Sequence, residues 1–177
     1  MFERFLLPQQ LKNFLEFCGY RNKSEQTHTL DLTNCTWLYP STLLPLAAFL
    51  KQNPELKYLP PKNGNVARYF SVIIDSQKPK DNCTYLPIVN LPKSQDKANS
   101  AIERIYGLHN NGKEYGGEQA FKYLISELSD NIYQHSKFCK AFIMAQRYER
   151  HGFAEICFFD DGITIKGAFE KKGMSFL

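Results

Sequence analysis

The run EQAFKYLISELSDNIYQHS, residues 118–136, is the strongest helical pattern in the chain and decides how its second half folds. Apolar residues recur in it every three or four positions, as they do on the buried face of an α-helix. This expected apolar stripe consists of Phe121, Leu124, Ile125, Leu128 and Ile132. We therefore expect a helix over 118–136 that packs its apolar face against a sheet.

Two strand-like runs, 141–147 and 153–159, supply strands for that sheet. The turn between them, residues 149–152 (ERHG), is short, charged and ends in glycine, so the two runs are expected to form a β-hairpin. The rest of the pattern predicts helices at 11–18, 41–52 and 101–108, strands at 27–32 and 85–90, and an element of undecided type at 69–74. This mixture indicates an α/β (α+β) fold.

The composition is that of a folded protein. Of the 177 residues, 43% are hydrophobic and 14% aromatic, which is enough to build a core and excludes a disordered chain. No apolar run approaches the ~20 residues that a membrane-spanning helix needs. The N-terminus lacks the apolar core of a signal peptide, and the five cysteines include no Cys-x-x-Cys pair for zinc or redox chemistry. We therefore expect a cytoplasmic protein with reduced thiols and no membrane contact.

Charge and polarity along the chain indicate partners and a domain boundary. The net charge of +4 is mild, and no basic cluster is interleaved with aromatic residues, so a nucleic-acid partner is not expected. The polar stretch 93–99 separates two sets of expected elements. We place the boundary there, between a first domain at 1–95 and a second at 96–177.

The first candidate site lies on the long helix. Glu127, Asn131 and His135 are spaced four residues apart, so they form one column along its surface. Carboxylate and amide oxygens are suitable ligands for Mg²⁺, and a carboxylate can also polarise a water molecule. The alternative is that this column is the solvated edge of a surface helix.

The second candidate site is the sequence Asp160-Asp161-Gly162, which directly follows the strand 153–159. Acids at the end of a buried strand are placed to meet a ligand at the edge of the sheet, and Gly162 allows the backbone to approach it closely. The alternative is an ordinary turn, because Asp-Gly is a frequent turn sequence.

Together and in this order, the two motifs resemble those of the GHKL ATPase superfamily, which includes histidine kinases, DNA gyrase, Hsp90 and MutL. Glu127-Leu-x-x-Asn131-x-x-x-His135 resembles the N box of that family, and Asp160-x-Gly162 resembles its G1 box. The hairpin between them fits the family's order of helix, strand, strand and motif. The resemblance implies ATP and Mg²⁺ as cofactors.

The resemblance also implies a role for each matching residue. Asn131 would hold Mg²⁺, and Glu127 would be the catalytic general base or would orient a water or a substrate hydroxyl. His135 would lie near the phosphates, Asp160 would accept the adenine amino group, and the glycine of the second motif would leave room for the base. Asp130, inside the first motif, is counted with the nucleotide-binding residues. The function implied is that of a Mg-ATP-binding module of a regulatory ATPase or protein kinase.

Two departures from the family pattern bear on this expectation. Thr164 replaces the second glycine of the G1 box, and the family's lid and phosphate-binding box would follow only after Leu177. We therefore expect this stretch either to be part of a longer protein or to be a short form that binds nucleotide poorly, in both cases without turnover of its own. A protein partner or a second copy, forming a homodimer, would cover the incomplete sheet.

The first half resembles a STAS domain, a small α/β module of anti-anti-sigma factors and transporter regulators. The resemblance rests on residues 29–50, TLDLTNCTWLYPSTLLPLAAFL, which match its strand, turn and helix. Tyr39 and Pro40 stand where the family carries an Asp and a phosphorylatable Ser, so no phosphoacceptor is assigned; Ser41 or Thr42 is expected to cap the helix. This half would dock a protein partner, and the alternative function is a non-catalytic adaptor with a degenerate nucleotide site.

Overall fold

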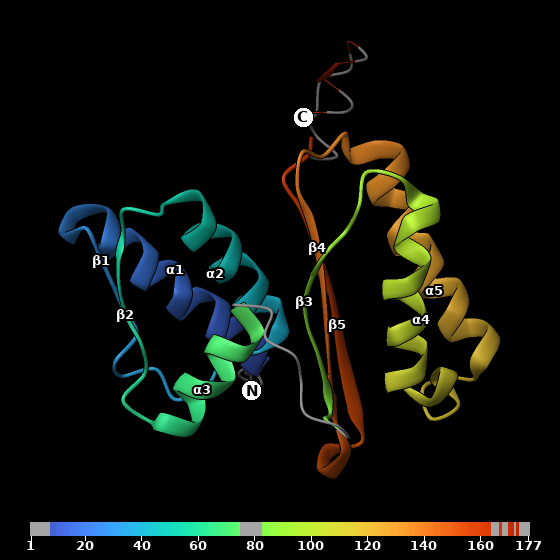
Figure 1. The fold of residues 1–177 in the computed structure, drawn as a ribbon, viewed down its shortest axis with the longest axis horizontal. Coiled ribbons are helices and arrows are strands. Elements are labelled where there is room, and N and C mark those ends of the chain that lie inside the picture. The colour runs from blue at the N-terminus through green and yellow to red at the C-terminus, as the bar shows by residue number, and fades with distance from the viewer. Residues whose placement is uncertain (1–7, 75–82, 164–166, 168–169, 172, 174–177) are drawn as a thin grey trace, which may run out of the picture. The chain divides into compact units, whose positions relative to one another are not determined.

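The computed structural model describes residues 8–74, 83–163, 167, 170, 171 and 173. The chain forms two compact units, Met1–Lys78 and Pro79–Leu177. Both units combine helices with short strands (Figure 1), which confirms the expected mixed α/β class.

The described part of the first unit contains a small parallel sheet and three helices. The helices are α1 (Gln9–Thr27), α2 (Pro40–Gln52) and α3 (Gly64–Ile74), and the strands are β1 (Thr29–Asp31) and β2 (Lys57–Leu59). β1 and β2 pair in parallel, with Thr29 opposite Lys57. The fully buried side chains of this unit include Leu30, Leu43, Leu46, Phe70 and Ile73.

Residues 69–74, whose type the sequence pattern left undecided, belong to a helix that begins with a side-chain cap. The Asn63 side-chain oxygen accepts hydrogen bonds from the backbone N–H groups of Asn65 (3.0 Å) and Val66 (3.3 Å). This arrangement satisfies N–H groups that the first helical turn cannot pair. The run that ends at Ile74 is therefore part of helix α3.

The start of α2 differs from the expectation. Tyr39 precedes the helix without a side-chain cap, and Pro40 is its first residue. Ser41 and Thr42 lie inside the first turn and are not caps, because proline already has the backbone angle of a first helical position. The Tyr39 N–H group donates instead to the side-chain oxygen of the buried Asn13 of α1, at 2.9 Å.

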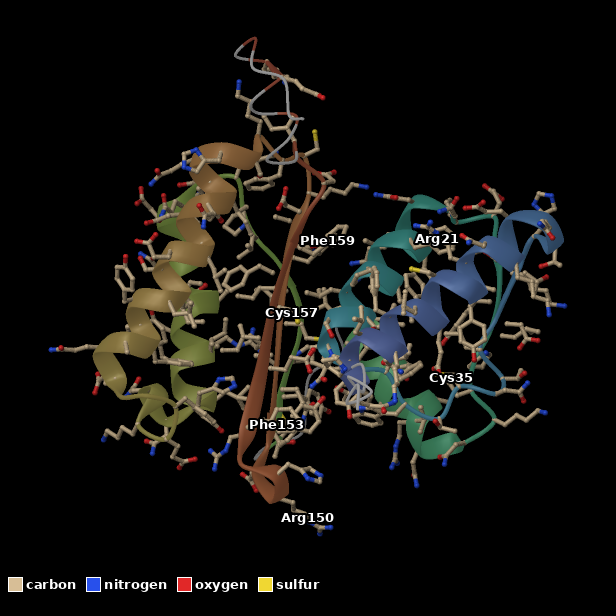
Figure 2. The ribbon with its side chains drawn as sticks, turned by 180° about the vertical axis from the view of Figure 1, so that it is seen from behind. Arg21, Cys35, Arg150, Phe153, Cys157 and Phe159 are labelled. Atoms are coloured by element: carbon tan, nitrogen blue, oxygen red, sulfur yellow. The ribbon has the colours of Figure 1, made fainter. Side chains whose placement is uncertain are left out.

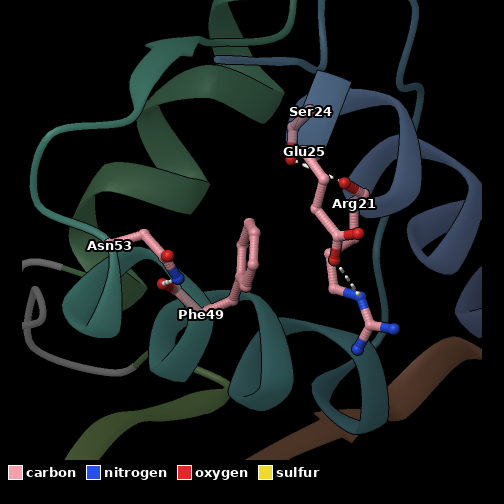
Figure 3. A network of polar contacts seen from close by, with 5 residues as sticks. All are labelled: Arg21, Ser24, Glu25, Phe49 and Asn53. Carbon is pink, nitrogen blue, oxygen red and sulfur yellow. Dashed lines mark hydrogen bonds and ion pairs between the residues drawn. The ribbon is translucent and has the colours of Figure 1, made fainter. Parts of the chain in front are cut away.

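Further polar contacts lie within α1 and at the end of α2 (Figure 3). The Ser24 hydroxyl donates to the Arg21 carbonyl at 2.7 Å, and the Arg21 guanidinium lies 3.9 Å from the Glu25 carboxylate. The Asn53 amide donates to the Phe49 carbonyl at 2.8 Å. That carbonyl belongs to the last turn of α2, so the Asn53 side chain helps to end the helix.

The second unit is a three-stranded antiparallel sheet covered on one face by two helices (Figure 1). The strands, in spatial order, are β3 (Tyr85–Asn90), β4 (Ala141–Tyr148) and β5 (Phe153–Asp160). The helices are α4 (Asn99–Leu108) and α5 (Glu118–Asn131), with short helical turns η1 (Gln95–Ala98), η2 (Asn110–Gly112), η3 (Ile132–Ser136) and η4 (Glu149–His151). The core between the two layers includes Ile105, Phe121, Ile125, Ile143 and Ala145.

The expected hairpin is confirmed. β4 and β5 pair along their whole length, from Ala141 opposite Asp160 to Tyr148 opposite Phe153. Alternate residues point to opposite faces of a strand, so Phe153, Cys157 and Phe159 share the face of β5 turned away from the helical layer (Figure 2). The hairpin fixes where β5 ends and so places the second motif.

The strand at 85–90, which the sequence placed in the first domain, pairs with β4 and therefore belongs to the second unit. The polar stretch 93–99 does not separate the units. It forms η1 and the first residue of α4, and its Ala98 is buried while Asp96 and Lys97 are exposed. A short surface helix has the same polar composition as a linker, so composition alone did not distinguish them.

Candidate nucleotide site

Helix α5 packs one narrow face against the core. Phe121, Ile125 and Ser129 are buried, and Ile132 continues this face into η3. The predicted stripe is wrong for Leu124 and Leu128, which are 55% and 37% exposed. At 100° per residue, Leu124 and Leu128 lie about 60° and about 20° outside the arc formed by the buried residues, so they flank the buried face on its exposed side.

The predicted column lies on this outer side of the helix. Glu127, Asn131 and His135 are all exposed, and none of their side chains makes a hydrogen bond or ion pair to another residue that the structure describes. The column runs beside Leu124 and Leu128, so the outer surface of α5 combines polar and apolar side chains. A carboxylate, an amide and an imidazole are therefore available to a ligand on one helix surface.

The helix changes its winding within the column. α5 ends at Asn131, and Ile132–Ser136 continues it as a π-helical turn. A π-helical turn bonds each residue to the fifth along instead of the fourth, and such turns occur often at functional sites. His135 therefore departs from the regular α-helical spacing that the sequence pattern assumed. Lys137, in the left-handed conformation (φ 51°), ends the turn.

Asp130 is set apart from the column. Its carboxylate accepts a hydrogen bond from the side-chain amide of Gln95, which lies in η1. Asp130 is partly buried, in contrast to the exposed column residues. In the structure, Asp130 therefore links α5 to η1. Its role in nucleotide binding, which the resemblance implied, stays a prediction.

The end of β5 is joined directly to the end of the α5 segment. The Ile163 N–H group donates to the Ser136 carbonyl at 2.6 Å. A Cβ atom on Gly162 would lie 2.1 Å from the same carbonyl oxygen, so only glycine fits this approach. The Gly162 N–H group donates to Asp160 Oδ1 at 2.9 Å, which orients that carboxylate. The second motif therefore packs against Ser136, the residue that directly follows the first motif.

Asp161, expected together with Asp160 to meet a ligand, instead forms a second connection within the chain. Its carboxylate accepts hydrogen bonds from the Cys139 and Lys140 N–H groups, each at 2.7 Å, and its own N–H donates to the Lys140 carbonyl at 3.0 Å. Burial acts to raise the pKa of Asp161, but the two N–H donors and the charge of Lys93 hold that pKa below its ordinary value. An acid placed directly after a strand was the only signal in the sequence.

The donor set fits a magnesium ion that arrives with a nucleotide. Among the described residues, no group of three His, Cys, Asp or Glu side chains converges, so the described part of the chain holds no cage for a bare metal ion. Mg²⁺ usually keeps several waters and takes one or two protein oxygens together with substrate phosphates. The Asn131 amide and the Glu127 carboxylate carry oxygens of that kind. Thr164, the departure in the G1-like motif, lies outside the described residues.

Comparisons with known proteins add no relative. No family model, no curated protein and no solved structure matches the chain. Among the helices that the structure describes, none has the length and apolar character required to cross a bilayer.

Proposed function

We propose that the second unit is a Mg-ATP-binding module of the GHKL type, belonging to a regulatory ATPase or protein kinase. One observation carries the proposal: the Ser136 carbonyl binds Ile163 and leaves room only for glycine at 162, so the Asp160-x-Gly162 motif adjoins the end of the helical column. Two motifs that are weak when taken separately are adjacent in the folded chain.

Each residue has a role that its chemistry permits. A bound Mg-ATP would supply a γ-phosphoryl group whose charge the metal neutralises. Asn131 would direct its amide oxygen to the metal, and Glu127 would accept a proton from an attacking water or hydroxyl. His135 would lie near the phosphates. Asp160, with Oδ1 held by the Gly162 N–H group, would use its other oxygen to accept the adenine amino group.

A second candidate function is a non-catalytic adaptor, present in the cytoplasm, whose nucleotide site is degenerate. The exposed Leu124 and Leu128 favour it, because apolar side chains beside the column are suited to contact another protein or a second copy. The first unit would contribute a docking surface in either case. Adaptor function predicts complex formation that does not depend on ATP, whereas the nucleotide-binding function predicts that Mg-ATP alters it.

Calorimetric titration of Mg-ADP and Mg-ATP into the chain tests the first proposal. We expect saturable binding that is lost in Asn131→Ala and retained in Gln134→Ala, a matched control because Gln134 is also exposed but lies outside the column. Equal binding by the parent chain and Asn131→Ala would remove the metal role of Asn131. Failure of the parent chain to bind either nucleotide would leave the adaptor as the better account.

A further inference from the structure

The first unit contains a groove that the nucleotide-binding proposal does not use. It has a volume of about 680 Å³ and lies between the end of α2, β2 and α3. Its lining includes the apolar side chains Leu50, Leu56, Tyr58, Ala67 and Ile74. These five side chains are half-buried, so the groove keeps an apolar floor in contact with water.

Among the described residues that line the groove, both charged side chains are cations. Lys51 and Arg68 both line it and are exposed, and no Asp or Glu is found among the lining residues that the structure describes. Cations beside an apolar floor favour a ligand that has negative charges next to apolar side chains. Two cations are too few to follow a nucleic-acid backbone, which needs a continuous basic path.

The wall of the groove at the end of α2 is well fixed. Asn53, one of the lining residues, bonds the Phe49 carbonyl through its side chain (2.8 Å) and its backbone N–H (3.1 Å), as Figure 3 shows for the side chain. The Leu56 N–H group donates to the Asn53 carbonyl at 3.0 Å. A surface held in this way requires little ordering when a partner binds, which favours affinity.

We propose that this groove binds an acidic segment of a partner protein, with apolar side chains of that segment on the groove floor and its carboxylates toward Lys51 and Arg68. A small molecule is a poorer occupant, because the exposed lining residues would leave much of its surface in water. The inference is independent of the nucleotide site on the second unit.

The test uses short fluorescent peptides in which glutamate alternates with leucine or phenylalanine, and matched peptides with lysine in place of glutamate. We expect the acidic peptides alone to bind the chain and to shift the backbone amide signals of Leu56, Ala67 and Ser71. Binding should weaken about tenfold in Arg68→Glu. It should be unchanged in Lys12→Glu, the same charge reversal at an exposed position on α1.

A second variant separates the apolar part of the proposal from charge and from folding. Ala67→Phe should fill the floor of the groove and weaken peptide binding while it leaves both cations in place, with circular dichroism confirming that each variant is folded. The proposal is overturned if the acidic peptides do not bind, if lysine peptides bind equally well, or if Lys12→Glu weakens binding as much as Arg68→Glu. Amide shifts at the same residues with a single-stranded oligonucleotide instead would assign the groove to nucleic acid.

Discussion

Gly162 is the residue on which the account of the site depends most closely. The Ser136 carbonyl oxygen lies 2.1 Å from the place where the Cβ atom would be, and Ser136 is the last residue of η3, directly after His135. That obstacle is backbone, which cannot rotate away as a flexible side chain can. The glycine is therefore required by the approach of two chain segments, in addition to any room that it leaves for a ligand.

Gly162→Ala should therefore destabilise the chain by about 1–3 kcal/mol, the usual cost of inserting a methyl group where there is no space. Gly107→Ala is the matched control: Gly107 lies inside α4 with no atom near its missing Cβ, so alanine should stabilise by about 0.5–1 kcal/mol through helix propensity. Urea denaturation measures both changes. Equal stability of Gly162→Ala and the parent chain would contradict the close approach.

His109 is a second residue with a measurable consequence, although it lies outside the proposed site. It is fully buried beside the rings of Tyr115 and Phe121, and Nδ1 lies 2.8 Å from the Ile105 carbonyl. Nε2 is buried with no hydrogen-bond partner in the described part of the structure. Burial, together with the charge of Arg147, lowers the pKa of His109 below its ordinary value of 6.5, and the Ile105 carbonyl offsets this only in part.

This lowered pKa predicts how stability depends on pH. The folded chain keeps His109 neutral, whereas the unfolded chain binds a proton near pH 6.5. Neutral His109 therefore costs the folded chain no stability above about pH 6.5. As the pH falls from there toward the folded-state pKa of His109, the free energy of unfolding decreases. His109→Phe should flatten this part of the curve of unfolding free energy against pH. An unchanged slope in His109→Phe would show that another group titrates.

At the scale of the elements, α5 connects the core to the site. Its inner face holds the sheet through Phe121 and Ile125, while its outer face carries Leu124 and Leu128 beside the column. Because the two faces belong to one helix, packing on the inner face sets the positions of Glu127 and Asn131, the two column residues within α5. Substitutions on the inner face of α5 should therefore change mainly the stability of the chain, and substitutions of the column residues should change mainly ligand binding.

Leu124→Ser and Leu128→Ser should each lower the free energy of unfolding by no more than about 1.5 kcal/mol, because the two side chains are 55% and 37% exposed and only part of each is buried. Ile125→Ala, on the buried face, should cost about 2–5 kcal/mol. Thermal and urea unfolding of the three variants test this division. A large loss in Leu124→Ser would place that residue in the core, as its spacing first indicated.

Sequence patterns predicted the elements better than their faces or partners. The helix at 118–136 and the hairpin after it have strong periodicity and a clear turn, and the structure contains both. Periodicity did not separate Leu124 from Ile125, because residues at the edge of an apolar arc have the same spacing as those at its centre. β2 has only three residues, too few for any pattern to establish.

At the scale of the whole molecule, the chain is two compact units with different proposed tasks. The candidate nucleotide site belongs wholly to the second unit, and the charged groove belongs wholly to the first. The sequence predicted two domains, but the assignment of β3 depended on which strand it pairs with, and a single sequence does not contain that information. The contact between Ser136 and the second motif likewise depends on tertiary structure, which sequence patterns do not show.

Titration of the ¹⁵N-labelled chain with Mg-ADP, followed by backbone amide NMR, tests the central claim most directly. The claim that Asn131 and the Asp160-x-Gly162 motif form one site predicts that the amide signals of Asn131, Ser136 and Gly162 shift together with a single dissociation constant. Asp160→Ala should abolish the shifts at both motifs. Amide shifts at neither motif, or at one motif alone, would contradict a single nucleotide site.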